Sequence, residues 1–220
     1  MKKTAEPKDR IIVIYDKLKT KYPNATCALN FKNPFQLLVA TILSAQCTDV
    51  RVNLVTPTLF KKYPSAKEFA KAKIAELEQL IRSTGFFRNK ARSIKNCAAV
   101  LIDKYSAAVP KEMADLTALP GVGRKTAGVI RAYAYGLSGI ICDTHFLRVT
   151  FRLGLTKNKD PEKVEKDIAA ILPENKWSAF STLMTTHGRA ICMARKPSCP
   201  TCPVLKLCPF GQENISKDTA

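Results

Sequence analysis

The stretch from Leu119 to Ala127, which reads Leu-Pro-Gly-Val-Gly-Arg-Lys-Thr-Ala, constrains the fold of this chain more than any other. Its proline and two glycines demand a tight turn, because glycine adopts backbone conformations that other residues avoid. On the near side, Val109-Pro110 opens a short helical segment that runs to Leu119. On the far side, Arg124 to Tyr135 show the spacing of a second helix. We therefore predict two helices joined by a glycine hairpin.

This hairpin is suited to binding a phosphate group. Gly121, Val122 and Gly123 can present successive backbone N–H groups, which together form a concave site for an anion. The N-terminus of the following helix adds further amides and the positive end of its dipole. The simpler alternative is a plain connection between two helices, with Lys125 as a solvated surface charge.

Helical spacing of apolar residues recurs along the rest of the chain, for example in residues 11–18 and 91–105. No segment shows the alternation of a β-strand. Signals for helix starts and stops stand at Asn33-Pro34, Ser65, Asp160-Pro161, Gly85 and Gly136. The sequence predicts an all-α protein with roughly nine or ten short helices.

The charge of the chain indicates a polyanionic partner. Lys and Arg number 36 against 18 Asp and Glu, which gives a formal net charge of +18 and a pI near 9.7. Solubility alone needs far less charge, so we expect nucleic acid as the partner and salt-sensitive binding. The sequence shows no secretion signal and no apolar run long enough to span a membrane. We expect a cytoplasmic, nucleoid-associated protein without a membrane partner.

Two residues are candidates for chemistry. Lys125 falls in the first turn of the helix after the hairpin, where the positive helix end disfavours a protonated amine. An unprotonated lysine can attack an electrophilic carbon and form a Schiff base. Asp143 precedes an amphipathic segment, which predicts a helix N-cap. A carboxylate at that place would also stabilise the positive charge that develops on a sugar as its glycosidic bond breaks, and both roles can coexist.

Four of the eight cysteines form a dense group near the C-terminus, with the spacing Cys192-x6-Cys199-x2-Cys202-x5-Cys208. In a chain of intracellular character, four thiols at this density predict a metal site and not disulfides. Zinc and an iron–sulfur cluster both accept four cysteines. Structural zinc sites usually pair two short Cys-x2-Cys knuckles, so a single knuckle between wider gaps favours the cluster. The remaining cysteines are predicted to be small buried hydrophobes: Cys27, Cys47, Cys97 and Cys142.

These features, in this order, resemble the endonuclease III family of DNA glycosylases, the iron–sulfur branch of the helix-hairpin-helix superfamily. The matching motifs are Leu43-Ser44-Ala45-Gln46 with Thr48-Asp49-Val50, Ser83-Thr84-Gly85, Asn89-Lys90-Ala91, the hairpin at 119–127, Asp143-Thr144-His145, His187-Gly188-Arg189 and the four-cysteine loop. They extend over nearly the whole chain. Each motif alone is weak, but the combination is highly specific.

The resemblance implies a two-lobed helical fold. Residues 27–137 would form a six-helix barrel with the helix-hairpin-helix, and residues 1–26 with 138–220 a helical domain around a [4Fe-4S] cluster held by the four cysteines. It also implies a bifunctional DNA glycosylase and AP lyase of base excision repair, acting on oxidised pyrimidines flipped out of duplex DNA. Lys125 would displace the base at C1′ and form a Schiff base, and β-elimination would follow. Asp143 would assist by charge stabilisation and proton handling.

The resemblance also implies that further residues contact DNA. Gln46 stands where the family fills the gap left by the flipped base, and Phe86 stands where it often has a leucine wedge. The alternatives are a helix cap for Gln46 and a core position for Phe86, the latter expected more strongly for Phe87. Arg195 and Lys196, between the first two cluster ligands, suit phosphate contact, and their alternative is a solvated loop charge.

One departure from the family concerns Gly128, which occupies a helical position where asparagine is common. Glycine there costs about 1 kcal/mol relative to alanine and leaves the range of lesions open. Two rivals within the superfamily are an adenine-mismatch glycosylase, which typically lacks the lysine, and an 8-oxoguanine glycosylase, which usually lacks the cluster. A non-enzymatic DNA-binding protein with a structural zinc site is the alternative from another class. We expect a monomer that binds damaged double-stranded DNA.

Overall fold

The structure is a computed structural model, and the residues that it describes are 6–218. These residues form twelve α-helices and four short 3-10 helices, and they contain no strand. The all-α prediction is confirmed. The helices outnumber those expected because some, such as α4 (Ala66–Lys71) and α7 (Met113–Thr117), are too short to show an apolar period in the sequence. None of the described helices combines the length and apolar character needed to cross a membrane.

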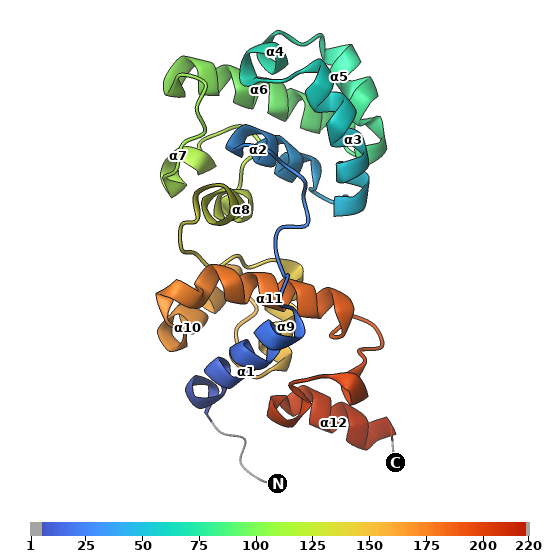
Figure 1. The fold of residues 1–220 in the computed structure, drawn as a ribbon, viewed down its shortest axis with the longest axis vertical. Helices are drawn as coiled ribbons and strands as arrows, with labels where there is room; N and C mark the ends of the chain where they lie inside the picture. Colours follow the sequence, from blue (N-terminus) through green and yellow to red (C-terminus); the bar gives the residue numbers. More distant parts are fainter. Residues whose placement is uncertain (1–5, 219–220) are drawn as a thin grey trace. The chain divides into compact units, whose positions relative to one another are not determined.

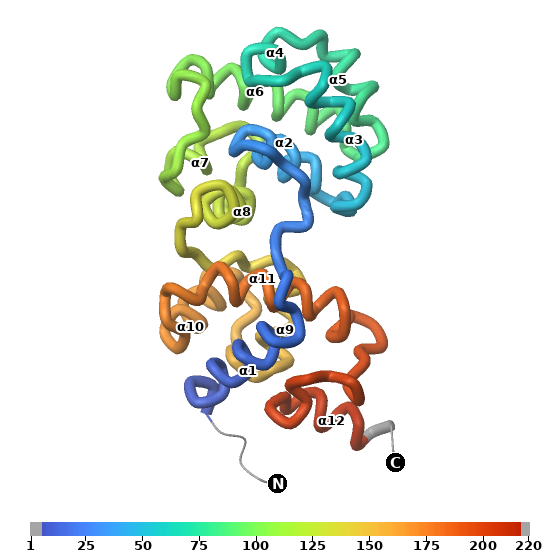
Figure 2. Tube along the Cα trace, viewed as in Figure 1, coloured from blue at the N-terminus to red at the C-terminus, as the bar shows by residue number. Residues whose placement is uncertain are grey.

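Contacts between Cα atoms divide the chain into two compact units. We name Cys27–Leu137 the hairpin unit, and Met1–Thr26 together with Ser138–Ala220 the cysteine unit. Each has its own apolar core. Figure 2 shows how the N-terminal segment, in blue, joins the orange and red segments of the C-terminal half.

The hairpin unit is built around α2 (Pro34–Leu43), in which every residue from 37 to 43 is buried. A helix that is apolar on all sides belongs in the middle of a core. Accordingly, α2 packs against α3 (Asp49–Lys62), α6 (Phe87–Tyr105) and α8 (Arg124–Tyr135). Helices α4 and α5 (Ile74–Ile81) pack on α6, and α7 packs on α8 (Figure 1).

The start of α2 follows the predicted capping signal. The Asn33 side chain accepts a hydrogen bond from the Gln36 backbone N–H at 2.9 Å. The helix before the hairpin is shorter than expected, because residues 109–111 are not helical and the Val109 and Lys111 carbonyls accept hydrogen bonds from side chains of α8. Tyr135 donates to the Val109 carbonyl, and Arg131 donates to the Lys111 carbonyl at 2.6 Å.

In the cysteine unit, α9 (Thr144–Arg152) packs against α11 (Trp177–Ala190), where Phe146 and Phe180 meet edge to face at 6.0 Å. Helix α1 (Pro7–Lys21) packs on α11 and on α10 (Pro161–Ile171). The α12 helix (Pro209–Asp218) packs on α9 and on the 3-10 turns of the cysteine loop. The buried Arg10 guanidinium ties α1 to this loop by donating to the Leu207 carbonyl at 2.6 Å.

Candidate active site and cysteine cavity

The glycine hairpin is anchored by its apolar residues and leaves its glycines at the surface. Leu119 and Val122 are buried, and the Val122 N–H donates to the Leu119 carbonyl at 3.1 Å. Gly121 has a φ of +79°, and a Cβ added to it would lie 2.7 Å from Ser93 Cβ. Only glycine fits this position, both for its backbone and for its space. Gly123 has no neighbouring atom within 4 Å of such a Cβ.

Helix α8 begins at Arg124 without a side-chain cap, because its N-cap residue is Gly123. Five other helices also begin without a side-chain cap, and five begin with one: α2, α3, α4, α9 and α10. The positive end of α8 is therefore open to an outside anion next to the exposed hairpin. Lys125 lies in this first turn with its side chain exposed, so an approaching molecule can reach its amine. Gly128 lies within α8 and does not interrupt it.

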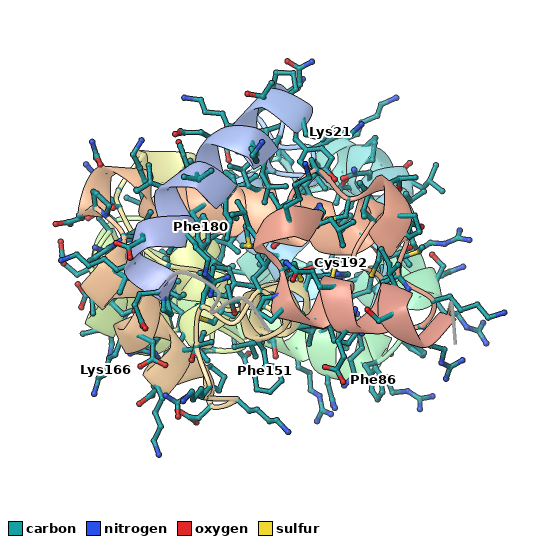
Figure 3. The ribbon with its side chains drawn as sticks, turned by 90° about the horizontal axis from the view of Figure 1, so that it is seen from below. Lys21, Phe86, Phe151, Lys166, Phe180 and Cys192 are labelled. Carbon is teal, nitrogen blue, oxygen red and sulfur yellow. The ribbon has the colours of Figure 1, made fainter. Side chains whose placement is uncertain are left out.

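Two other predicted DNA contacts, Gln46 and Phe86, have exposed side chains on left-handed backbone in the same unit. Gln46 has a φ of 51° in the turn between α2 and α3. Phe86 has a φ of 46° directly before α6 and is 62% exposed (Figure 3). Non-glycine residues in this region cost roughly 1–3 kcal/mol each, and they persist only where the surrounding structure enforces them.

The structure excludes one alternative at each of these positions. Phe86 is not a core residue, whereas Phe87 is partly buried and packs against the core of the hairpin unit. Gln46 caps neither neighbouring helix, because the C-cap of α2 is Ser44 and the N-cap of α3 is Thr48. The core interpretation of Phe86 and the cap interpretation of Gln46 are both wrong.

Asp143, in the cysteine unit, is the N-cap of α9, as the sequence predicted. Its Oδ1 accepts a hydrogen bond from the Phe146 N–H at 2.7 Å. Its Oδ2 accepts one from the Thr185 hydroxyl at 3.1 Å. The carboxylate is only 9% exposed, and each oxygen is held by one donor. Thr185 lies on α11 and had no sequence signal that linked it to Asp143.

The four C-terminal cysteines line one cavity of about 340 Å³, a volume that includes its open mouth. Cys192, labelled in Figure 3, is one of them. Among the described residues, no three His, Cys, Asp or Glu side chains converge on a position for a single metal ion.

Each of these four sulfurs has a nitrogen donor beside it. The donor–sulfur pairs are Arg152 Nη1 and Cys192 at 3.4 Å, Asn214 Nδ2 and Cys199 at 3.8 Å, His187 Nε2 and Cys202 at 3.6 Å, and the Gly211 N–H and Cys208 at 3.3 Å. Donors of this kind stabilise sulfur ligands of metals. Burial raises the pKa of the Cys208 thiol to about 11, so its thiolate needs a bound cation. The donor set fits a metal centre with four thiolate ligands.

The His187 ring is oriented by its second neighbour, the Tyr22 hydroxyl, 3.0 Å from Nδ1. Burial lowers the pKa of His187 to about 4, so the ring is neutral at pH 7. Burial also raises the pKa of Tyr22 to about 12, which keeps its hydroxyl protonated. With Cys202 as a thiolate ligand, the Nε2–H of His187 would donate to it, and Nδ1 would accept from the Tyr22 hydroxyl. Neither the tyrosine nor its link to the cysteine loop was expected from the sequence.

Arg195 and Lys196 are exposed on the loop between the first two cysteines. The loop is closed by the Ser198 N–H, which donates to the Ile191 carbonyl at 3.0 Å. Arg152 holds the near side of the loop by donating to the Met193 carbonyl at 2.7 Å. These hydrogen bonds therefore restrain the loop that carries the two cationic side chains.

The other cysteines agree only in part with the expectation of burial. Cys97 is buried, and the burial raises the pKa of its thiol to about 12. Cys27, Cys47 and Cys142 are partly buried at the margins of the two cores. Their sequence positions gave no sign of this difference.

Residues 39–174 match the family described as HhH-GPD superfamily base excision DNA repair protein. The endonuclease III of Synechocystis sp. is 49% identical over 213 residues, which are 96% of this chain and 97% of that protein. The endonuclease III of Bacillus subtilis is 43% identical over 203 residues, which are 92% of this chain and 93% of that protein.

Solved structures give a similar result. A non-covalent endonuclease III–DNA complex is 44% identical, covers 95% of this chain and 98% of its own, and has a TM-score of 0.91. A trapped endonuclease III–DNA covalent intermediate is also 44% identical, covers 94% of this chain and 98% of its own, and has a TM-score of 0.90.

Proposed function

Because this chain belongs to the endonuclease III family of HhH-GPD base excision DNA repair proteins, we propose that Lys125 is the nucleophile of its glycosylase and lyase reactions. The enzyme is a bifunctional DNA glycosylase and AP lyase whose partner is damaged double-stranded DNA. One observation carries the assignment of Lys125: its exposed amine lies in the first turn of an uncapped helix, directly after the glycine hairpin.

The hairpin binds the DNA backbone through amides of residues 121–123, which brings the amine close to a deoxyribose. The Lys125 nitrogen forms a bond to C1′ while the C1′–base bond breaks, and the base departs with the bonding electrons and takes up a proton. Opening of the sugar ring gives the Schiff base. Loss of a C2′ proton then expels the 3′ phosphate by β-elimination.

In this reaction Asp143 stabilises the positive charge that develops at C1′ and accepts or returns protons. Its local geometry supports the role, because the Phe146 N–H and the Thr185 hydroxyl orient the carboxylate in a site with little exposure to water. A carboxylate held in this way needs little reorganisation when charge develops next to it.

Oxidised pyrimidines are the proposed lesions, and a lesion must leave the base stack before its sugar can be attacked. Phe86 is the wedge that enters the stack, and Gln46 occupies the space that the base leaves. Both side chains are exposed, and both stand on strained backbone that the fold enforces.

The cysteine unit is proposed as the domain that holds a [4Fe-4S] cluster, and the hairpin unit as the six-helix barrel. Cys192, Cys199, Cys202 and Cys208 would be the four ligands, and the cluster would make their loop rigid. The spacing of the four cysteines favours the cluster over zinc, because a single Cys-x2-Cys knuckle stands between wider gaps. The four sulfurs line one cavity, as ligands of one shared group would. On this rigid loop, Arg195 and Lys196 contact DNA phosphates.

Borohydride trapping on DNA with an abasic site tests the nucleophile. Lys125→Gln should lose the covalent adduct by at least about 100-fold, because no Schiff base can form at residue 125. The matched control is Lys67→Gln, which changes an exposed lysine at the same position of α4 in the same unit. It should trap as the wild type does.

Trapping of Lys125→Gln at the wild-type level would show that another residue is the nucleophile. A wild-type protein that binds damaged DNA but is never trapped would instead support the non-enzymatic alternative. Release of free base from duplexes with different lesions tests the substrate class, and oxidised pyrimidines should be released faster than alkylated purines.

A further inference from the structure

A buried lysine connects the two turns that carry Gln46 and Phe86. Lys90, on α6, is only 5% exposed. Its ammonium group donates to the Leu43 carbonyl and to the Thr84 carbonyl, both at 2.8 Å. These two acceptors lie far apart in the chain, and Lys90 brings them to one point.

Each acceptor lies at the base of one of the strained turns. Leu43 is the last residue of α2, and the chain then turns through Gln46 toward α3. Thr84 is the last residue of the 3-10 helix Arg82–Thr84, and Gly85 and Phe86 follow it. A shift of either carbonyl would change where the exposed side chain beyond it points.

Burial of a lysine at this position costs free energy. Burial lowers the pKa of Lys90, and the nearby Cys47 opposes this effect only in part. Its acceptors are two carbonyls and not a carboxylate, so no ion pair offsets the loss of water around the ammonium group. An apolar side chain would suit the buried face of α6 better if packing were the only requirement.

The same helix also supports the glycine hairpin. Ser93 lies one turn after Lys90, and a Cβ on Gly121 would lie 2.7 Å from its Cβ. Helix α6 therefore carries the Phe86 turn at its start, holds the Gln46 turn through Lys90, and lies against the hairpin at Ser93.

We propose that Lys90 is a positioning residue for base extrusion: its ammonium group holds the two turns at one separation, so that Gln46 and Phe86 enter the duplex together. This inference rests on the proposed function. It predicts that Lys90 matters for opening a paired duplex and not for the chemistry at an abasic site that is already unpaired.

The test compares Lys90→Met with Lys95→Met. Lys95 is also on α6 and donates to the Ala72 carbonyl at 2.6 Å, away from both turns, so it is a matched control. In the free protein, amide hydrogen exchange should become faster in residues 44–47 and 84–87 for Lys90→Met only. Lys90→Arg, which keeps a charged donor, serves as the second variant if the methionine variant does not fold.

On a duplex with a paired lesion, Lys90→Met should reduce single-turnover base release by about 10- to 100-fold, because small misplacements of positioning groups have effects of this size. Cleavage of a single-stranded abasic site should stay within about two-fold of the wild type, since no base has to be extruded. Phe86→Ala should reduce base release by a smaller factor in the Lys90→Met background than in the wild type, because both changes disrupt the same base-extrusion step.

Unchanged exchange in both turns, or equal losses on the paired and the single-stranded substrate, would overturn the proposal. So would full additivity of Lys90→Met with Phe86→Ala. A wild-type protein with no base release and no trapping would overturn the proposed function, and hydrogen exchange would still decide whether Lys90 holds the turns.

Discussion

At the scale of single residues, Asp143 caps a helix in the structure and has a proposed chemical role as well. One carboxylate oxygen caps α9, and the other accepts the Thr185 hydroxyl. Asparagine caps a helix about as well as aspartate does, so a change to asparagine separates the charge from the cap.

We predict that Asp143→Asn folds normally and that its single-turnover base release falls by about 100-fold or more, because a preorganised charge next to the reacting centre is lost. Asp160→Asn is the matched control, since Asp160 caps α10 by accepting from the Lys163 N–H at 3.0 Å. Both variants should have nearly the wild-type melting temperature by circular dichroism. Full activity of Asp143→Asn would show that Asp143 serves only as a helix cap.

At the scale of elements, the hairpin contains two glycines with different duties. Gly121 has a φ of +79° and lies against Ser93, so the fold itself requires it. Gly123 has an ordinary φ of −95° and open space around it, so the fold does not require a glycine at this position. If the hairpin binds a phosphate, a side chain at position 123 would block the phosphate from the backbone amides.

Gly121→Ala should lower the free energy of unfolding by roughly 1–3 kcal/mol, through backbone strain and the contact with Ser93. Gly123→Ala should lower it by less than about 1 kcal/mol, the usual size of an N-cap effect. Yet it should weaken binding to abasic duplex DNA. Urea unfolding and fluorescence anisotropy measure the two quantities. Wild-type affinity of Gly123→Ala would argue against a phosphate at the hairpin.

At the scale of the whole molecule, the residues with proposed roles are distributed over both units. The hairpin unit carries Lys125, Gln46 and Phe86, and the cysteine unit carries Asp143 and the four-cysteine loop. The net charge of +18 belongs to the whole chain, and side chains tipped with nitrogen project from the ribbon in Figure 3. Because each unit has its own core, damage to the cysteine loop should leave the hairpin unit folded.

Iron and sulfide analysis of the purified protein should find about four irons per chain. Cys199→Ser should lose them and bind DNA more weakly, since the loop that presents Arg195 and Lys196 is no longer held. Hydrogen exchange within residues 27–137 should be unchanged. Cys97→Ala, a buried cysteine of the hairpin unit, is the control and should retain the iron. Zinc in place of iron would contradict the cluster.

Much of the fold could be predicted because its signals are local. The Asn33 cap, the glycine stop at Gly136 and the extent of α8 from Arg124 to Tyr135 rest on residues within a few positions of one another. The density of the four cysteines was likewise visible in their spacing. The start of the short helix α7 was predicted too early, because the carbonyls of Val109 and Lys111 accept hydrogen bonds from side chains of α8 and residues 109–111 are not helical.

By itself, the sequence determined the all-helical class, the hairpin with its lysine, the capping aspartate and the four-cysteine loop, since each depends on interactions of near neighbours. Only the tertiary structure decided that Phe86 is exposed, that Thr185 holds Asp143, and that Lys90 joins two turns. Leu43 and Lys90 are 47 positions apart, and Asp143 and Thr185 are 42 apart. Such pairs meet only when a whole core has packed, so no local pattern in the chain announces them.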